Sequence, residues 1–426
     1  MIWIYEILFW MGLALAAPFY LLRMRRRGGY ARDFMERFGV FSREKAGRLR
    51  DLKPVWLHAV SVGEVDLALQ LIEQLRSRPD CPPLALSTTT STGHAMAAKK
   101  LPPNVPLFYY PLDSRFCFGR VHRLLQPRAF VLVEAELWPG HLRFCAQRGV
   151  PMALINARLS NRCLPRYRRF RWFLEPGFAG FKLVTLQCQA DRERLGGLGF
   201  PGSALQVAGC LKYDTAHGVD AARRERLLND FGFFEKRPVW LAGSTHPGEE
   251  ELAVDIYHRL REKRPSLVLA LAPRHAERAG QILTMTRERG LRMARRSKLS
   301  EAGGEMDGMV LDTTGELKYL YERADVIFMG KSLLGQGGQN IIEPAVLGKP
   351  IVFGPHMENF PVVTADFLEA GAAIQVSDAA GLERETARLL DDPAARQRLG
   401  ENARAVVQAK RGAMERTIHG LRSLLG

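Results

Sequence analysis

The 426-residue sequence lacks the loops that define the common nucleotide-dependent enzymes. No G-x-G-x-x-G loop follows the first strand of either predicted half, and no Walker G-x-x-x-x-G-K-[ST] loop is present, which argues against a hydride-transfer enzyme and against an NTPase. No Asp-x-Asp pair could hold a divalent metal against a diphosphate, so no metal is predicted. The six cysteines form no C-x-x-C pair, which indicates neither a zinc site nor a disulfide framework and fits a reducing compartment.

Acidic side chains are scarce relative to basic ones, with 45 Asp and Glu against 61 Lys and Arg and a formal net charge of +16. This balance favours an anionic partner, such as nucleic acid, an acidic membrane surface or a phosphorylated substrate. The stretch 156–172, NARLSNRCLPRYRRFRW, carries six arginines and no acid. Beside an apolar N-terminus, anionic lipid or a phosphorylated glycolipid fits this stretch as well as nucleic acid does, and a solvated basic helix is the structural alternative.

The first 22 residues, MIWIYEILFWMGLALAAPFYLL, contain Glu6 as their only charge. As a helix they would measure roughly 33 Å, enough to cross a bilayer core, and the basic RMRRR follows the apolar run, unlike in a signal peptide. We therefore predict a membrane-anchor helix over 1–22, with the rest of the chain in the cytoplasm. Glu6 and Pro18 weaken a span, so a helix lying in the membrane interface is the alternative.

Short apolar runs alternate with helical stretches from Val55 onward, and the alternation starts again after residue 220. This pattern predicts parallel sheets that are covered by helices on both faces. The expected class is α/β, with two doubly wound Rossmann-like domains that face each other across a cleft. The expected boundaries are an anchor helix over 1–22, an N-terminal domain over 23–209, a linker over 210–220, a C-terminal domain over 221–400 and a final helix over 401–426.

Polar and glycine-rich loops follow several strands of the second half, and a parallel sheet binds its ligands at such strand ends. Gly337 and Gly338 would let the backbone approach a ligand closely. Asn340 is expected to start a helix whose N–H groups suit a phosphate, and Arg274 adds a cation. Together these loops predict a nucleotide site, although each loop alone also suits an ordinary helix cap.

The stretch 55–68, VWLHAVSVGEVDLA, is expected to form a strand, a tight loop and a helix in the first half. The loop has a single glycine, Gly63, and the carboxylate of Glu64 stands where a phosphate-binding loop would have its later glycines. A carboxylate at this junction can act as a general base toward a hydroxyl group. The alternative is an acid that only favours the helix dipole.

Nine motifs occur in the order found in one enzyme family: HAVSVGE, STTTSTGHAMA, FVLVEAELWP, NARLS, GCLKYD, GSTHPGEE, PRHAER, DTTGEL and GGQNIIEPA. The sequence therefore resembles the 3-deoxy-D-manno-octulosonic acid (Kdo) transferases of lipid A biosynthesis, from the apolar N-terminus to about residue 360. The resemblance implies the two-domain GT-B glycosyltransferase fold. It also implies transfer of Kdo from CMP-Kdo to a lipid A precursor at the cytoplasmic face of the inner membrane, with inversion at the anomeric carbon and without a cofactor.

The resemblance also implies roles for individual residues. Glu64 matches the proton acceptor, and Glu136 and Lys212 match residues that stabilise the transition state. The donor contacts that the resemblance implies are Pro273, Arg274, Gly315, Glu316, Leu317, Asn340, Ile341, Ile342 and Glu343. From the loops and the basic stretch themselves we add Ser244, Thr245, Gly337 and Gly338 on the donor side and Ser61, Gly63, Arg158 and Arg162 on the acceptor side. The sequence departs from the family's pattern at Lys331, Gln339 and Cys210, where Gly, His and Asn are usual.

Two other interpretations of the sequence stay open. One is a GT-B transferase with a different nucleotide sugar or acceptor, or a sugar-nucleotide epimerase, which would not need the apolar N-terminus. The other is a non-catalytic, membrane-tethered protein that binds anions, which would explain the net charge but not Glu64 or the donor-type loops. Nucleic acid is not an expected partner, and the sequence predicts no oligomeric state.

Overall fold

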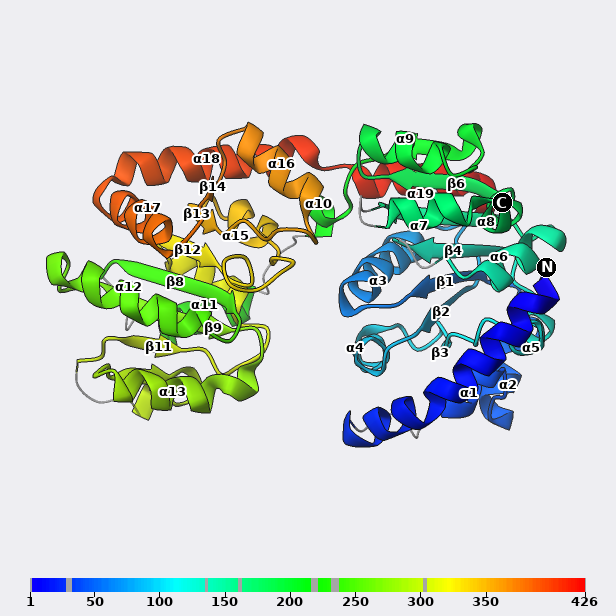
Figure 1. The fold of residues 1–426 in the computed structure, drawn as a ribbon, viewed down its shortest axis with the longest axis horizontal. Coiled ribbons are helices and arrows are strands. Elements are labelled where there is room, and N and C mark those ends of the chain that lie inside the picture. Colours follow the sequence, from blue (N-terminus) through cyan, green and yellow to red (C-terminus); the bar gives the residue numbers. More distant parts are fainter. Residues whose placement is uncertain are drawn as a thin grey trace. The chain divides into compact units, whose positions relative to one another are not determined.

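The computed structural model describes residues 2–27, 33–134, 137–159, 163–215, 221–230, 237–301 and 305–425. They form two compact units, which are residues 1–215 together with 412–426 (unit 1) and residues 216–411 (unit 2). Each unit is built around one seven-stranded sheet with helices on both faces (Figure 1). The α/β class with two doubly wound units is therefore confirmed.

Unit 1 contains a wholly parallel sheet with the strand order β3-β2-β1-β4-β5-β6-β7. Its strands are almost entirely buried, as expected for a parallel sheet covered on both faces. The register places Leu57 of β1 between Leu86 of β2 and Val131 of β4. The strands are β1 Val55–Ala59, β2 Leu84–Thr88, β3 Leu107–Tyr109, β4 Ala129–Val133, β5 Met152–Ala157, β6 Phe181–Leu186 and β7 Leu205–Val207.

The helices of unit 1 build one apolar core on each face of the sheet. Residues of α3 and α19 belong to one core, and residues of α5, α6 and α8 belong to the other. The helices are α1 Ile2–Arg27, α2 Arg43–Leu49, α3 Val62–Arg76, α4 Ser91–Lys100, α5 Arg115–Leu125, α6 Pro139–Gln147, α7 Leu164–Arg169, α8 Arg171–Phe178, α9 Gln189–Gly196, α10 Lys212–Thr215 and α19 Ala413–Leu425.

The C-terminal helix α19, red in Figure 1, belongs to unit 1 although it follows all of unit 2 in the chain. The carboxylate of Asp214 accepts hydrogen bonds from the backbone N–H groups of Gly412 and Met414, both at 2.7 Å, and so caps α19. Ile418 and Leu421 pack into the core that contains α3. The expected final stretch 401–426 thus contains the end of α18 and the whole of α19.

The N-terminal stretch forms the single helix α1, which lies along unit 1. Tyr5 donates a hydrogen bond of 2.6 Å to Asp113. Glu6 Oε1 accepts from the Ser114 hydroxyl at 2.7 Å and from the Arg115 N–H at 2.9 Å, at the start of α5. The lone charge of the apolar run therefore caps a neighbouring helix. Within the part of the chain that the structure describes, no helix combines the length and apolarity needed to cross a bilayer, so the expected anchor is not confirmed.

Unit 2 contains a second parallel sheet with the order β10-β11-β9-β8-β12-β13-β14. Its strands are β8 Val239–Thr245, β9 Val268–Pro273, β10 Met293–Arg295, β11 Gly308–Val310, β12 Val326–Met329, β13 Ile351–Phe353 and β14 Ile374–Gln375. Its helices are α11 Ala221–Asp230, α12 Glu249–Lys263, α13 Ala279–Glu288, α14 Leu317–Leu320, α15 Ile342–Val346, α16 Pro361–Glu369, α17 Ala379–Asp391 and α18 Pro393–Lys410.

Both sheets reverse their direction of winding beside their first strand. In unit 1 the chain adds β2 and β3 on one side of β1 and then returns to add β4 on the other side. In unit 2 the reversal falls between β8 and β12. A crevice forms beyond the carboxyl ends of two strands at such a switch point, and open α/β sheets bind ligands there.

Candidate active site

The carboxylate of Glu64 lies in the first turn of α3, directly after β1 at the switch point of unit 1. Its oxygens accept hydrogen bonds from the Val60 N–H and the Ser61 hydroxyl, both at 2.9 Å, and Ser61 Oγ accepts from the Glu64 N–H at 3.3 Å. Ser61 and Gly63 are exposed and Glu64 is half-buried. The helix-capping contact thus exists, and the same contact holds an accessible carboxylate at the strand end.

A second carboxylate, Glu134, follows β4 on the other side of the same switch point. Lys212 Nζ lies 3.4 Å from Glu134 Oε1 and Arg158 Nε lies 3.8 Å from Glu134 Oε2. The side-chain amide of Asn156 donates to Glu134 at 3.3 Å. One carboxylate between two cations leaves a net positive charge, which suits an anionic group of a substrate.

The backbone is strained at this cluster. Glu134 has φ of 65° and Asn156 has φ of 55°, a left-handed conformation that costs roughly 1–3 kcal/mol for a non-glycine residue. The Asn156 side chain also accepts the Leu211 N–H at 3.0 Å, which fixes the segment that leads to Lys212. Strain of this kind concentrates at functional sites.

The structure brings together two residues that the sequence predicted, Lys212 and Arg158, and adds two that it did not, Glu134 and Asn156. Glu134 stands in the predicted motif FVLVEAELWP, so its place directly after a buried strand was the available signal. The predicted residues Glu136 and Arg162 lie outside the described residues.

In unit 2 the fully buried carboxylate of Glu249 joins the loops that follow β8 and β12. Its Oε2 accepts from the N–H groups of His246 at 3.0 Å and Lys331 at 2.6 Å. Its Oε1 accepts from the N–H groups of Ser332 at 3.2 Å and Leu333 at 3.3 Å. A buried charge needs such partners, because an uncompensated one is strongly destabilising. Glu249 therefore fixes both loops at the switch point of unit 2.

The next residue, Glu250, is also fully buried and joins the ends of β8 and β9. Arg278 donates to both of its oxygens, at 2.8 and 3.1 Å, and the Thr245 hydroxyl donates at 2.8 Å. The predicted donor contact Thr245 thus has its hydroxyl engaged within the protein. Its neighbour Ser244 is buried and has φ of 54°, so the backbone turns sharply as β8 ends.

The loop after β12 has the backbone freedom that the sequence predicted. Gly337 and Gly338 have φ of 108° and 67°, and a Cβ on them would lie 2.4 Å from Asn359 Nδ2 and 2.4 Å from Met357 Sδ, respectively. Lys331 has φ of 57°, which glycine, the usual family residue at this position, would adopt without strain. The positive φ angles of this loop therefore explain why glycine is usual at these positions in the family.

The helix expected to start at Asn340 begins at Ile342 instead and has five residues. Asn340 Oδ1 accepts the Ile342 N–H at 3.1 Å, so this side chain turns the chain into the helix. Ile341 and Ile342 are fully buried and can offer a ligand only their backbone. Glu343 lies in the first turn, as predicted.

Arg274 and Glu343 act on the same buried phenol, that of Tyr321. Burial raises the pKa of Tyr321 well above its usual value, the Glu343 carboxylate raises it further and the Arg274 cation opposes this. Arg274 follows Pro273 at the end of β9, and its N–H donates to Thr245 O at 3.0 Å. The ends of β8 and β9 and the start of α15 are therefore close neighbours.

The third predicted loop, Gly315 to Leu317, precedes α14. Gly315 has φ of 82°. The Glu316 carboxylate accepts from the Thr313 hydroxyl at 2.8 Å and pairs with Arg296 Nε at 2.9 Å. A Cβ on Gly243 of β8 would lie 3.7 Å from Leu317, so this loop also borders the end of β8. Unit 2 thus gathers every predicted donor segment at one sheet edge.

Two doubly wound units, one with a glycine-rich switch-point loop and one with an accessible acid, give this chain the GT-B fold. The solved structure of a UDP-GlcNAc 2-epimerase from Neisseria meningitidis bound to UDP-GlcNAc shares this fold, with a TM-score of 0.62 and 14% identity over 87% of this chain and 100% of that chain. Family models match residues 32–215, as 3-deoxy-D-manno-octulosonic-acid transferase (kdotransferase), and residues 244–406, as glycosyl transferases group 1.

Two curated relatives extend the match over most of the chain. A 3-deoxy-D-manno-octulosonic acid transferase of Bordetella pertussis is 34% identical, covering 95% of this chain and 95% of the relative. One of Haemophilus influenzae is 32% identical, covering 93% of this chain and 92% of the relative. The chain therefore belongs to the Kdo transferase family, which confirms the resemblance inferred from its motifs.

Glu249→Gln tests whether this carboxylate fixes the loops of unit 2. The amide retains one acceptor oxygen but turns an NH₂ group toward N–H donors, which leaves two buried N–H groups without an acceptor. We expect the free energy of unfolding of unit 2 to fall by about 2–4 kcal/mol. Hydrogen exchange at the amides of residues 331–334 should be at least about tenfold faster.

The matched control is Glu251→Gln in the same helical turn, because the Glu251 carboxylate accepts from the Gly248 N–H at 3.1 Å and does not reach the second loop. Exchange at residues 331–334 should not change in this variant. Unchanged exchange in Glu249→Gln would contradict the role assigned to Glu249.

Proposed function

We propose that this chain transfers Kdo from CMP-Kdo to a lipid A precursor, with inversion at the anomeric carbon and without a metal in the transfer step. The observation that carries the proposal is the Glu64 carboxylate at the switch point of unit 1, where the helix start presents an acid instead of a phosphate-binding loop. Family membership supports the sugar, and the arrangement of the loops in unit 2 supports a nucleotide donor.

In the proposed reaction Glu64 takes the proton from a hydroxyl of the acceptor sugar. The hydroxyl oxygen forms a bond to the anomeric carbon of Kdo, and the bond from that carbon to the phosphate oxygen of CMP breaks. Because the attack comes from the face opposite the leaving CMP, the configuration inverts. The Val60 N–H and the Ser61 hydroxyl orient the carboxylate for the proton transfer.

Cationic side chains would supply the charge that metal ions supply in other transferases. Lys212 and Arg158 flank Glu134 at the second strand end of unit 1, and we assign Lys212 to the negative charge that develops on the departing CMP. Glu136, which lies outside the described residues, keeps its predicted role in stabilising the transition state. In unit 2, Arg274 is exposed at the end of β9 and would contact the donor phosphate, and Glu343 would accept from the ribose diol.

The exposed face of α1 supports an acceptor that lies in a membrane. Ile4, Leu8, Met11 and Leu15 are 57–82% exposed and recur at helical spacing along one face. An apolar pocket of about 480 Å³ lies between α1 and the α7–α8 region, with Ile4, Leu8 and the exposed Trp172 among its lining residues. We propose that α1 lies in the interface of the inner membrane on its cytoplasmic side, with this face buried among the lipids.

Glu64→Gln tests the proposed proton acceptor. The amide keeps the shape of the side chain but cannot take a proton, so kcat for transfer should fall by about 10²–10⁴-fold. The assay uses CMP-Kdo generated in situ and a bisphosphorylated lipid A precursor, and mass spectrometry detects a product that is heavier by one or more Kdo units.

The matched control is Asp66→Asn, since Asp66 is the next acid on α3 and its carboxylate accepts from Gln70 of the same helix and from Lys100 of α4. Full activity in Glu64→Gln would refute its role. If the folded wild-type protein gives no product, other nucleotide sugars should be tested as donors. They are the main alternative because the donor loop carries the cation of Lys331 where the family usually has glycine.

Met11→Gln combined with Leu15→Gln tests the proposed membrane contact. Each change removes apolar area that lipid would otherwise cover, at about 25 cal/mol per Å². We expect the affinity for phospholipid vesicles, measured by co-sedimentation, to fall at least about tenfold. Val207→Gln, which changes an exposed apolar residue of β7, should bind like the wild type. Equal sedimentation of all three proteins would count against the interfacial placement of α1.

A further inference from the structure

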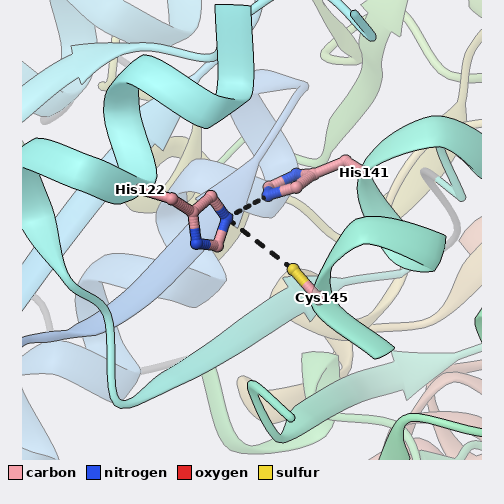
Figure 2. Close-up of side chains that lie close together, drawn as sticks. All are labelled: His122, His141 and Cys145. Carbon is pink, nitrogen blue, oxygen red and sulfur yellow. Dashed lines mark hydrogen bonds between the residues drawn. The ribbon is translucent and has the colours of Figure 1, made fainter. Parts of the chain in front are cut away.

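Three side chains with nitrogen or sulfur donors meet in the core of unit 1 and take no part in the proposed transfer. His122 comes from α5, and His141 and Cys145 come from α6 (Figure 2). The two Nε2 atoms are 2.7 Å apart, and Cys145 Sγ lies 3.7 Å from His122 Nε2. All three are buried, and their donor atoms lie within 4.8 Å of one another.

We propose that His122, His141 and Cys145 form a structural site for Zn²⁺ or a similar soft metal ion. The bound ion would link α6 to α5. Imidazole nitrogen and thiolate sulfur are the ligands that Zn²⁺ and Cu⁺ prefer, whereas Mg²⁺ and Ca²⁺ require oxygen. The inference is independent of the proposed function.

The sequence folds so that these donors converge. His141 and Cys145 are four residues apart on α6, so both project from the same face of that helix toward α5. Asp113 accepts the N–H groups of Gly140 at 2.9 Å and His141 at 2.7 Å, which fixes the first turn of α6. The hydroxyl of Tyr110 lies 2.6 Å from His141 Nδ1 and orients the ring, so that Nε2 faces the cluster.

The same nitrogen, His122 Nε2, lies beside both the His141 ring and the Cys145 thiol. An unprotonated imidazole nitrogen and a thiolate sulfur each carry a lone pair that a metal ion can bind. The cluster thus holds three potential ligands from two helices in the core of unit 1.

A cation in the cluster would bind the lone pairs of all three atoms. The Tyr110 oxygen would accept from His141 Nδ1–H, as the partner of a metal-bound imidazole usually does. The Cys145 thiol would lose its proton to solvent as the bond from sulfur to the metal forms.

One distance between the donor atoms already fits a tetrahedral centre, and the ligands would have to shift for the others to fit. With bonds of about 2.0–2.1 Å to nitrogen and 2.3 Å to sulfur, the expected separations are about 3.6 Å between nitrogen and sulfur and about 3.3 Å between the nitrogens. The distance from Cys145 Sγ to His122 Nε2, 3.7 Å, already agrees. The two histidine nitrogens, now 2.7 Å apart, would separate by about 0.6 Å.

On its outer side the cluster borders a surface pocket of about 650 Å³, which His122 lines together with Glu6, Arg115, Arg123 and Arg148.

The test is cobalt binding by the full chain, which is first freed of metal and then titrated with Co²⁺. We expect one Co²⁺ per chain, with an intense near-ultraviolet band from thiolate-to-cobalt charge transfer. Cys145→Ser should remove this band. The matched control is Cys117→Ser on α5, because Cys117 is also a buried free cysteine and lies outside the cluster, and this variant should keep the band.

Zinc X-ray absorption of the wild-type protein keeps the proposal testable if Cys145→Ser does not fold. The expected first shell contains one sulfur and two imidazole nitrogens. Absence of stoichiometric Co²⁺ and Zn²⁺ binding by the wild type would overturn the proposal. A zinc shell without sulfur, or a cobalt band that persists in Cys145→Ser, would overturn it as well.

Discussion

Unit 2 of this protein depends on one buried carboxylate, Glu249. Its charge is compensated by backbone N–H groups of the loops after β8 and β12, which are more than eighty residues apart in the sequence. Because the cost of burying an uncompensated charge is large, these loops must stay where they meet Glu249. The glycines of the second loop are therefore presented on a fixed backbone, which would lower the ordering cost of binding the proposed donor.

The carboxylates at the switch point of unit 1 are more accessible than the fully buried Glu249 of unit 2. Glu64 is half-buried and makes two short hydrogen bonds to its own turn, so it is both oriented and accessible. Glu134 is held by two cations and an amide on a strained backbone. Burial thus separates the roles of these acids: the fully buried Glu249 organises the backbone, whereas the accessible Glu64 is suited to proton transfer.

The sequence predicted the features that local pattern determines. Buried apolar runs gave the parallel strands, and the loops after them gave Arg274, Gly337 and Glu343 at one sheet edge. Contacts between segments that are distant in the sequence could not be predicted from local pattern. Glu249 is one of three consecutive glutamates in the first turn of α12. From the sequence, each of them could equally be an acid that only stabilises the helix dipole. The capping of α5 by Glu6 and of α19 by Asp214 each join segments about a hundred or more residues apart, and no periodicity reports such contacts.

Calorimetric binding of CMP is the most direct test, because we propose that unit 2 binds the nucleotide and that unit 1 accepts the proton. The wild type should bind one CMP per chain, Arg274→Ala should weaken the affinity about ten- to hundredfold through loss of a charged hydrogen bond, and Glu64→Gln should bind like the wild type. Absence of saturable CMP binding by the folded wild type, or weakening by Glu64→Gln but not by Arg274→Ala, would contradict this division of labour.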